Sequence, residues 1–443
     1  MGRASENTPQ HKEKKISIAL LAHVDAGKTT LSESLLYTAG KIRSFGRVDK
    51  GDAYLDTYEL EKKRGITIFS KQAVFSFGGT EITLLDTPGH VDFSAEMERT
   101  LQVLDYAVLV ISAADGVQAH TQTLWRLLRR YKVPAFLFVN KMDQNGTDIS
   151  SIMTELKERL SANIVNCMNP ETEECKEEIA LCDEELLEKY IEEGDFSADT
   201  IPSLVAAGKL FPCFSGSALK TEGIGKLLQA LDTLTTAKEY KEEFAARVFK
   251  IARDEVGNRL TYLKVTGGVL RARMEIEVAE GCREKVNQIR IYSGERYESV
   301  PEVGAGTICA VTGLLKTYPA QGLGSETEGI GAALNPVLTY RVELPEGCDA
   351  AVFLPKLREL EEEQPELHVV WNEKLQEIQV QVMGEVQIEI LQSLILERFG
   401  VQVCFGTGNI VYKEPISRPV EGVGHFEPLR HYAEVHLLLE PGE

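Results

Sequence analysis

The feature that most constrains this chain is a short apolar segment that leads through a glycine-containing loop into an amphipathic segment. Residues 15–22 (KISIALLA) have the length and apolar character of a buried strand, and residues 29–40 (TTLSESLLYTAG) carry leucines at helical spacing before a glycine. The loop between them, 22–29, has the sequence AHVDAGKT, which is the first of four short motifs that we call strings. A strand, a loop and a helix in this order form the setting in which backbone amides bind phosphate. The pattern predicts a doubly wound α/β domain with a phosphate site at the start of its first helix.

The phosphate loop predicts roles for individual residues. Its backbone amides are expected to surround the β-phosphate of a nucleotide, and the residues concerned are Asp25, Ala26, Gly27, Lys28, Thr29 and Thr30. Lys28 is expected to reach the β- and γ-phosphates, and Thr29 to offer a hydroxyl to Mg²⁺. Ala22 stands where the pattern GxxxxGK[ST] has its first glycine, which requires a negative φ at that position.

A second string, DTPGH at 86–90, directly follows a strand-like segment that pairs with its predecessor through a Gly-Gly turn. At the carboxyl end of a strand beside the phosphate loop, Asp86 is expected to hold Mg²⁺ through a water. The amide of Gly89 is expected to donate to the γ-phosphate. A chance match to these five residues in a chain of this length is on the order of 1 in 10⁴.

A third string, RGITI at 64–68, precedes this hairpin. Thr67 is expected to add its hydroxyl to Mg²⁺ and its amide to the γ-phosphate, which would order the loop before it only in the triphosphate state. Residues 41–64 are therefore a candidate switch. The three predicted metal ligands are Thr29, Thr67 and Asp86.

A fourth string, NKMD at 140–143, follows another buried strand and identifies the base. The carboxylate of Asp143 is expected to accept two hydrogen bonds from guanine, whose edge offers two donors where adenine has no matching pair. Asn140 is expected to tie the base loop to the phosphate loop, and the stem of Lys141 to lie over the base. Together the strings predict a site for GTP or GDP.

The segment SGSALK at 215–220 lies between a strand and a helix and completes the predicted base site. The backbone amides of Ser217 and Ala218 are candidates for the guanine O6, and Leu219 belongs to the same predicted segment.

The composition excludes several classes of protein. The 443 residues carry a net charge of −20, which argues against general binding to DNA or other phosphate backbones. No apolar run reaches the length of a membrane span, and residues 1–15 are polar, so we expect a disordered N-terminal extension, no membrane partner and a cytoplasmic location. Much of the acidity falls in residues 171–195, where a solvated acidic helix is expected.

The four strings resemble those of translational GTPases of the elongation factor G group, and most closely those of the ribosomal-protection tetracycline resistance proteins. The sequences that carry this resemblance are LAHVDAGKTTLSESLLYTAG, VDKG and NKMDQNG, together with a short insertion between Asn140 and Ser217. The resemblance extends from Ile16 onward, and it implies a family that continues beyond Glu443. It also implies a partner, the ribosome with its RNA and proteins, and a monomeric protein.

The remaining segments indicate a multidomain fold. Residues 16–240 are expected to form the P-loop GTPase domain. Short alternating strands between glycines favour a β-barrel over 241–334. A βαββαβ order favours a ferredoxin-like α+β domain over 335–409. Residues 410–443 resemble only the start of a fourth, incomplete domain.

The resemblance also implies catalytic roles. His90 occupies the position where other GTPases orient the attacking water with a glutamine, and the alternative is that it merely caps its turn. Val24 and Ile66 match apolar gate residues beside this histidine, while Lys28 and Gly89 stabilise the charge that develops on the phosphate.

Two further residues keep alternatives open. Asp25 could help to hold a monovalent cation, or it could make a structural hydrogen bond. Arg64 could act as an arginine finger in cis, although anchoring of the switch or contact with RNA is favoured.

Three functions compete at this point: a ribosome-dependent GTPase that releases tetracycline, a translocase of the elongation factor G type, and a GTP-gated ribosome-binding module without catalysis. The intact DTPGH string with His90 counts against the third function. The short insertion and the sequence of the phosphate loop and its helix favour the GTPase that releases tetracycline over the translocase.

Overall fold

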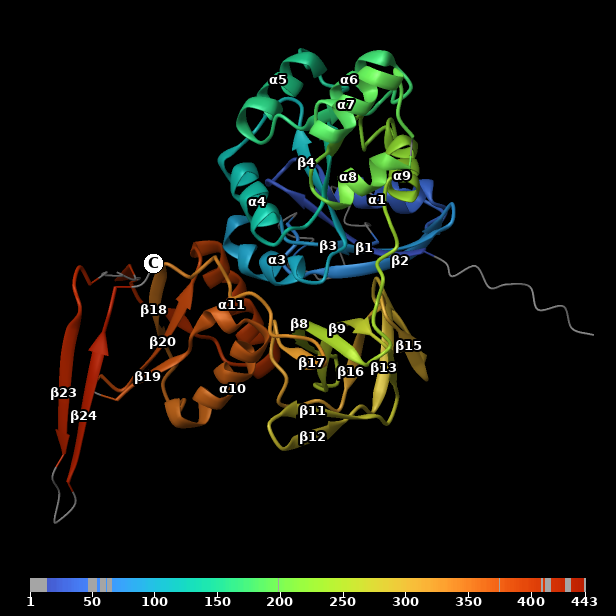
Figure 1. The fold of residues 1–443 in the computed structure, drawn as a ribbon. Helices are drawn as coiled ribbons and strands as arrows, with labels where there is room; N and C mark the ends of the chain where they lie inside the picture. The colour runs from blue at the N-terminus through green and yellow to red at the C-terminus, as the bar shows by residue number, and fades with distance from the viewer. Residues whose placement is uncertain are drawn as a thin grey trace, which may run out of the picture.

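The computed structural model describes three successive folded units and a terminal hairpin (Figure 1). The described residues are 14–46, 54–55, 61, 66–197, 199–373, 375–407, 409–410, 416–426 and 432–441. The expected disordered extension therefore lies, apart from its last two residues, outside the described residues. Among the helices that are described, none has the length and apolar character needed to cross a membrane.

The first unit is built on a seven-stranded sheet. Its strands are β1 (Lys14–Ala22), β2 (Lys71–Phe77), β3 (Thr80–Asp86), β4 (Tyr106–Ser112), β5 (Ala135–Asn140), β6 (Ile164–Asn166) and β7 (Phe211–Ser215). They lie in the order β2-β3-β1-β4-β5-β7-β6, in which β2 is antiparallel to β3 and all other neighbours are parallel. The carboxyl ends of β1, β3 and β5, where three of the four strings begin, therefore meet at one edge of the sheet.

Helices cover both faces of this sheet, as a doubly wound fold requires. They are α1 (Lys28–Thr38), η2 (Val91–Phe93), α3 (Ser94–Leu101), α4 (Ala119–Arg130), α5 (Ile149–Arg159), α6 (Glu173–Ala180), α7 (Glu184–Glu193), α8 (Thr200–Ala206) and α9 (Ile224–Thr233). On β1, Ile16, Ile18 and Leu20 pack in one cluster with α1 and α9, while Ala19 and Leu21 pack on the opposite face with α3 and α4. The expected fold class is confirmed for this unit.

The acidic segment differs from the expectation of one solvated helix. The chain breaks there into α6 and α7, because Asp183 accepts a hydrogen bond from the Leu186 amide and caps a new helix. Cys175, Ile179 and Leu186 are buried in the first core cluster, so the two helices are anchored on one side and acidic on the other.

The second unit is an antiparallel β structure. Its strands are β8 (Ala245–Arg253), β9 (Arg259–Gly267), β10 (Val269–Arg271), β11 (Glu275–Ala279), β12 (Cys282–Lys285), β13 (Gln288–Ser293), β14 (Arg296–Val300), β15 (Glu302–Gly304), β16 (Ile308–Thr312) and β17 (Gly322–Gly324). Six of them form a sheet in the order β14-β13-β16-β9-β8-β17, and the ribbons β10-β15 and β11-β12 complete the wall around one hydrophobic core. Phe249 and Ile308 belong instead to a core cluster of the first unit, so the two units are packed together.

The third unit is an α+β sandwich. Its elements are β18 (Leu338–Glu343), α10 (Ala350–Glu363), η3 (Pro365–Leu367), β19 (Val370–Asn372), β20 (Glu377–Val382), α11 (Glu385–Phe399), β21 (Cys404–Phe405) and β22 (Asn409–Ile410). The strands lie in the order β19-β20-β18-β21, with β22 also paired to β18. This order and the βαββαβ sequence of elements confirm the ferredoxin-like expectation.

The last described element is a hairpin of β23 (Val420–Phe426) and β24 (Ala433–Leu439), which extends away from the third unit in Figure 1. Apolar side chains such as Val423, Val435 and Leu437 are exposed on it. The interpretation of residues 410–443 as the start of a further domain stays a prediction.

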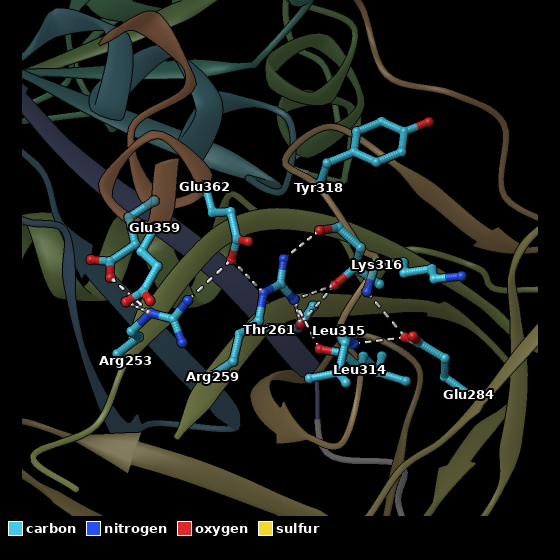
Figure 2. A network of polar contacts seen from close by, with 12 residues as sticks. Arg253, Arg259, Thr261, Glu284, Leu314, Leu315, Lys316, Tyr318, Glu359 and Glu362 are labelled. Atoms are coloured by element: carbon cyan, nitrogen blue, oxygen red, sulfur yellow. Dashed lines mark hydrogen bonds and ion pairs between the residues drawn. The ribbon is translucent and has the colours of Figure 1, made fainter. Parts of the chain in front are cut away.

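Arginines of the second unit join it to helix α10 of the third (Figure 2). Arg253 pairs with Glu359 and Glu362, and the buried Arg259 donates to Glu362 at 3.0 Å. The same guanidinium donates to the carbonyl oxygens of Leu314 at 2.8 Å and Thr317 at 2.6 Å. Arg259 therefore fixes a loop of its own unit and the neighbouring helix at once.

Candidate functional site

A cavity of 260 Å³ lies where α1 begins, at the carboxyl ends of β1 and β3. Each of the four strings contributes to its wall. The lining residues are His23, Val24, Asp25, Gly27, Lys28, Thr29, Thr30, Ile66, Thr67, Gly89, His90 and Lys141. Segments that are far apart in the sequence thus converge on one space.

The phosphate loop has the backbone that an anion site needs. Asp25 and Gly27 adopt left-handed conformations, with φ of 62° and 88°, and Gly27 is the N-cap of α1. The amides of the first helical turn have no acceptor within the helix and carry the positive end of its dipole. Ala22 is not among the described residues with positive φ, so alanine is accommodated at that position.

A buried polar cluster adjoins the cavity through Lys28 and Thr67, which line it. Lys28 Nζ lies 2.5 Å from Asp86 Oδ1 and 3.2 Å from Thr67 Oγ1. Ser32 Oγ donates to the same Asp86 oxygen at 3.1 Å. The other oxygen, Asp86 Oδ2, is buried and has no hydrogen-bond partner among the described residues. A buried carboxylate oxygen of this kind suits a hard cation such as Mg²⁺, and Thr29 and Thr67, the other two predicted metal ligands, line the cavity.

Gly89 brings its backbone close to this cluster. A Cβ placed on Gly89 would lie 3.4 Å from the carbonyl oxygen of Ala22 and 3.8 Å from Lys28 Cε. The main chain of the second string, DTPGH, therefore lies directly beside the phosphate-loop lysine.

Asn140 connects the base loop to the phosphate loop. Its Nδ2 donates to the Ala26 carbonyl oxygen at 2.9 Å, and its Oδ1 accepts from the Ala218 amide at 2.8 Å. A Cβ on Gly27 would lie 2.3 Å from Asn140 Nδ2, which explains why glycine is needed there. Three of the predicted binding segments are thus joined through one buried side chain.

Asp143 lies beside Lys220 and Ser217. The distance from Lys220 Nζ to Asp143 Oδ2 is 3.6 Å. A hydrogen bond from Ser217 lowers the pKa of the Asp143 carboxyl, and Lys220 lowers it further. The side chain is therefore an ionised acceptor at neutral pH, as recognition of the guanine edge requires.

The amides predicted for the guanine O6 have other partners in this conformation. Ser217 donates its amide to the Glu222 carbonyl oxygen at 3.1 Å, and Ala218 donates to Asn140. The amide of Leu219 has no acceptor among the described residues, and its side chain is exposed. The turn that closes between Ser217 and Glu222 occupies the first amide and Asn140 occupies the second, and the pattern SGSALK reveals neither contact.

His90 lines the cavity together with both predicted gate residues, Val24 and Ile66. Its Nδ1 accepts a hydrogen bond from the Asp92 amide at 3.2 Å, which is the contact expected of a histidine that caps its turn. Asp92 Oδ1 lies 3.4 Å from the same nitrogen. The capping contact and the position in the cavity coexist, so the two roles do not exclude each other.

Two further histidines lie beside the site, and sequence reasoning did not single out either of them. His23 and the buried His120 on α4 have ring centroids 5.9 Å apart. Burial, followed by the proximity of His23 and His90, lowers the pKa of His120 to about 4. A single histidine on a helix carries no sequence signal for this placement.

The structure describes only part of the predicted switch, residues 41–64. Arg64 and most of residues 47–65 lie outside the described residues, so its two suggested roles stay predictions. Asp25 is exposed, and neither the cation site nor a structural hydrogen bond is established for it.

Comparison with known protein families shows which family the chain belongs to. Residues 13–237 match the elongation factor Tu GTP binding domain, residues 243–322 match elongation factor G domain 2, and residues 335–407 match elongation factor G domain III. The chain belongs to the elongation factor G family of GTPases. GTP and GDP are accordingly its nucleotides.

The relatives that resemble the chain include tetracycline resistance proteins and an elongation factor G. Tetracycline resistance protein TetO of Streptococcus pneumoniae is 32% identical, and TetM from transposon Tn5251 of the same organism is 34% identical; each match covers 97% of this chain and 70% of the relative. Elongation factor G 2 of Syntrophus aciditrophicus is 30% identical over 96% of this chain and 75% of its own length. A crystal structure of a Thermus thermophilus protein superposes with a TM-score of 0.78 at 25% identity, covering 97% of this chain and 73% of that one.

Proposed function

We propose that this chain is a ribosome-dependent GTPase that protects the ribosome from tetracycline by releasing the bound drug. The observation that carries the proposal is the convergence of His90, Lys28 and Thr67 on one cavity. The names of the TetO and TetM relatives support the link to tetracycline. Because each of these matches covers 97% of this chain, we assign the same function to it.

In the proposed reaction, water attacks the γ-phosphorus of GTP as the bond to the β–γ bridging oxygen breaks and GDP leaves. His90 orients the water, and Val24 and Ile66 restrict its access to the imidazole. Lys28 and the Gly89 amide stabilise the negative charge on the phosphate oxygens. When bound, Mg²⁺ neutralises further phosphate charge, and Thr29, Thr67 and Asp86 are the residues that would hold it.

A first experiment tests catalysis. We expect His90→Ala to keep the Kd for GTP within about twofold and to lower ribosome-stimulated hydrolysis by about a hundredfold or more. His425→Ala, in the exposed hairpin, is the matched control and should keep wild-type turnover. Unchanged turnover in His90→Ala would remove this histidine from the mechanism and would favour a GTP-gated binding module.

A second experiment separates drug release from translocation, because the family also includes elongation factor G 2 at 30% identity. Release of tetracycline from ribosomes and movement of tRNA are measured in parallel with the natural gene product and GTP. Drug release without tRNA movement supports protection. Movement of tRNA without drug release supports a translocase instead.

A further inference from the structure

Asp92 lies between the predicted catalytic histidine and the third unit. On one side, its amide donates to His90 Nδ1 at 3.2 Å, and its Oδ1 lies 3.4 Å from that nitrogen. On the other side, its Oδ2 accepts from the amides of Val386 at 2.9 Å and Gln387 at 3.3 Å. These two amides open helix α11, so one short side chain joins His90 to a helix that begins almost 300 residues later.

Helix α11 has no capping side chain of its own. Its N-cap is Gly384, which makes no side-chain hydrogen bond to the first turn. The first amides of a helix need an acceptor, and an anion also interacts favourably with the dipole at that end. The carboxylate of Asp92 supplies both across the boundary between the two units.

Gly384 makes this contact possible. A Cβ on Gly384 would lie 2.3 Å from Asp92 Oδ1 and 2.4 Å from both Asp92 Cγ and Oδ2. Any larger residue would therefore displace the carboxylate, because real Cβ atoms do not approach other atoms so closely. The third unit thus offers a site shaped for this side chain.

Apolar packing holds the same helix against both nucleotide segments. Ile390 and Leu394 of α11 form a buried cluster with Ile68 and Phe93, and the gate residue Ile66 packs against it. Ile68 follows Thr67 directly, and Phe93 follows Asp92. One face of α11 therefore contacts the segment of Thr67 and the segment of His90 at the same time.

We propose that Asp92 is a positioning residue through which helix α11 of the third unit holds the imidazole of His90 in place for GTP hydrolysis. The inference rests on the proposed catalytic role of His90. Docking of α11 takes up Asp92 Oδ2 and fixes this residue, and the main-chain amide of Asp92 then orients the imidazole by donating to Nδ1. Movement of the third unit would release the carboxylate and with it the histidine, so the docking of this unit controls turnover.

The charge on Asp92 agrees with this arrangement. Burial raises the pKa of its carboxyl, but the contact with His90 and the amides of Gln387 and Val386 outweigh burial and lower it overall. The side chain is therefore a carboxylate at neutral pH, as an acceptor at a helix N-terminus should be.

The test compares two variants that break the link from opposite sides. Asp92→Ala removes the carboxylate, while Gly384→Ala displaces it from the third unit without changing the first. We expect each to lower the kcat of ribosome-stimulated hydrolysis by about ten- to a hundredfold, with the Kd for GTP within about twofold of the wild-type value. The double variant should be no slower than the slower single variant, because both changes break one link.

Asp349→Ala is the matched control. Asp349 caps α10 in the same unit by accepting from the Ala351 amide at 2.8 Å, and it has no contact with His90 among the described residues. Wild-type kcat in this variant supports the inference. It is overturned if Gly384→Ala keeps wild-type kcat, or if Asp349→Ala loses as much activity as the other two variants.

A second readout does not depend on activity. Carbon-13 labelling of aspartate carboxyls allows Asp92 to be titrated by NMR in the wild type and in Gly384→Ala. Loss of the Val386 and Gln387 amides should raise the pKa of the Asp92 carboxyl. If ribosomes do not stimulate the wild-type chain, the proposed function fails, and this titration alone decides the link: a raised pKa supports it, and an unchanged pKa overturns it.

Discussion

Lys264 of the second unit donates a hydrogen bond to Asp105 of the first at 2.7 Å, and both side chains are almost completely buried. The same ammonium donates to Ser17 Oγ at 2.8 Å and to the Val103 carbonyl oxygen at 3.0 Å. All three donor positions of Lys264 are therefore used in the first unit, and Asp105 also accepts from the Ser17 amide at 2.9 Å. A fully hydrogen-bonded ion pair thus joins the nucleotide domain to the β unit.

Removal of this lysine should loosen the two units. Lys264→Met leaves Asp105 buried without its cation, and we expect the free energy of unfolding to fall by about 3–5 kcal/mol. Lys15→Met is the control, because Lys15 pairs with Glu81 at 2.9 Å at the surface and should contribute at most about 1 kcal/mol. Urea denaturation followed by circular dichroism measures both. Equal losses in the two variants would contradict the assignment of a buried pair.

Nucleotide affinity should depend on Asn140 through its two protein contacts. Asn140→Ala removes the hydrogen bonds to the Ala26 carbonyl oxygen and from the Ala218 amide, each about 1 kcal/mol. We expect the Kd for GDP to rise by about ten- to a hundredfold, measured by isothermal titration calorimetry. Asn163→Ala is the control, since Asn163 bonds the Lys209 carbonyl oxygen at an exposed position and should leave the Kd unchanged. A wild-type Kd in Asn140→Ala would show that the loops hold their positions without it.

Much of the nucleotide site could be predicted because its chemistry lies in contiguous strings. Residues 22–29 carry the strand end, the turn and the helix start together, so local rules place the amides without knowledge of the fold. Asn140, Lys28 and Asp86 come together because parallel strands end at one edge of a sheet. The ferredoxin-like unit followed from the βαββαβ order of its predicted elements.

Contacts between residues far apart in the sequence could not be predicted, because they depend on tertiary packing. Asp92 caps a helix 294 residues away, and no spacing rule connects it to Val386. His120 lies on α4, where only packing brings it near His23. The division of the acidic segment is different, because Asp183 before an apolar-periodic run is a helix-start signal that could have been found in the sequence.

His120 should make the stability of the protein depend on pH between about 4 and 6.5. Its folded pKa is about 4, whereas an unfolded chain binds the proton below about 6.5. Between these values the unfolded state binds more protons, so the stability contribution is fully present above pH 6.5 and is lost as the pH falls to 4. The difference corresponds to about 3 kcal/mol. Urea midpoints across this range should fall less steeply in His120→Gln than in the wild type, while His425→Gln keeps the wild-type slope. Parallel curves for His120→Gln and the wild type would contradict the buried, neutral imidazole.

Arg259 should not be replaceable by lysine. Its planar fork reaches Glu362, the Leu314 carbonyl oxygen and the Thr317 carbonyl oxygen at once (Figure 2). A lysine ammonium keeps the charge but cannot occupy these separate positions, so Arg259→Lys leaves buried carbonyl oxygens without donors. We expect a loss of about 2–4 kcal/mol in the free energy of unfolding.

The control for this change is Arg271→Lys, because Arg271 pairs with Glu302 at 2.9 Å on the surface. That substitution should cost less than about 1 kcal/mol. Thermal and urea denaturation of the two variants measure the difference. If Arg259→Lys is as stable as Arg271→Lys, the ammonium satisfies the loop, and the contact between the second unit and α10 depends on charge alone. A large loss in Arg259→Lys shows instead that the geometry of the guanidinium holds the loop and α10 together, since the charge is the same in both side chains.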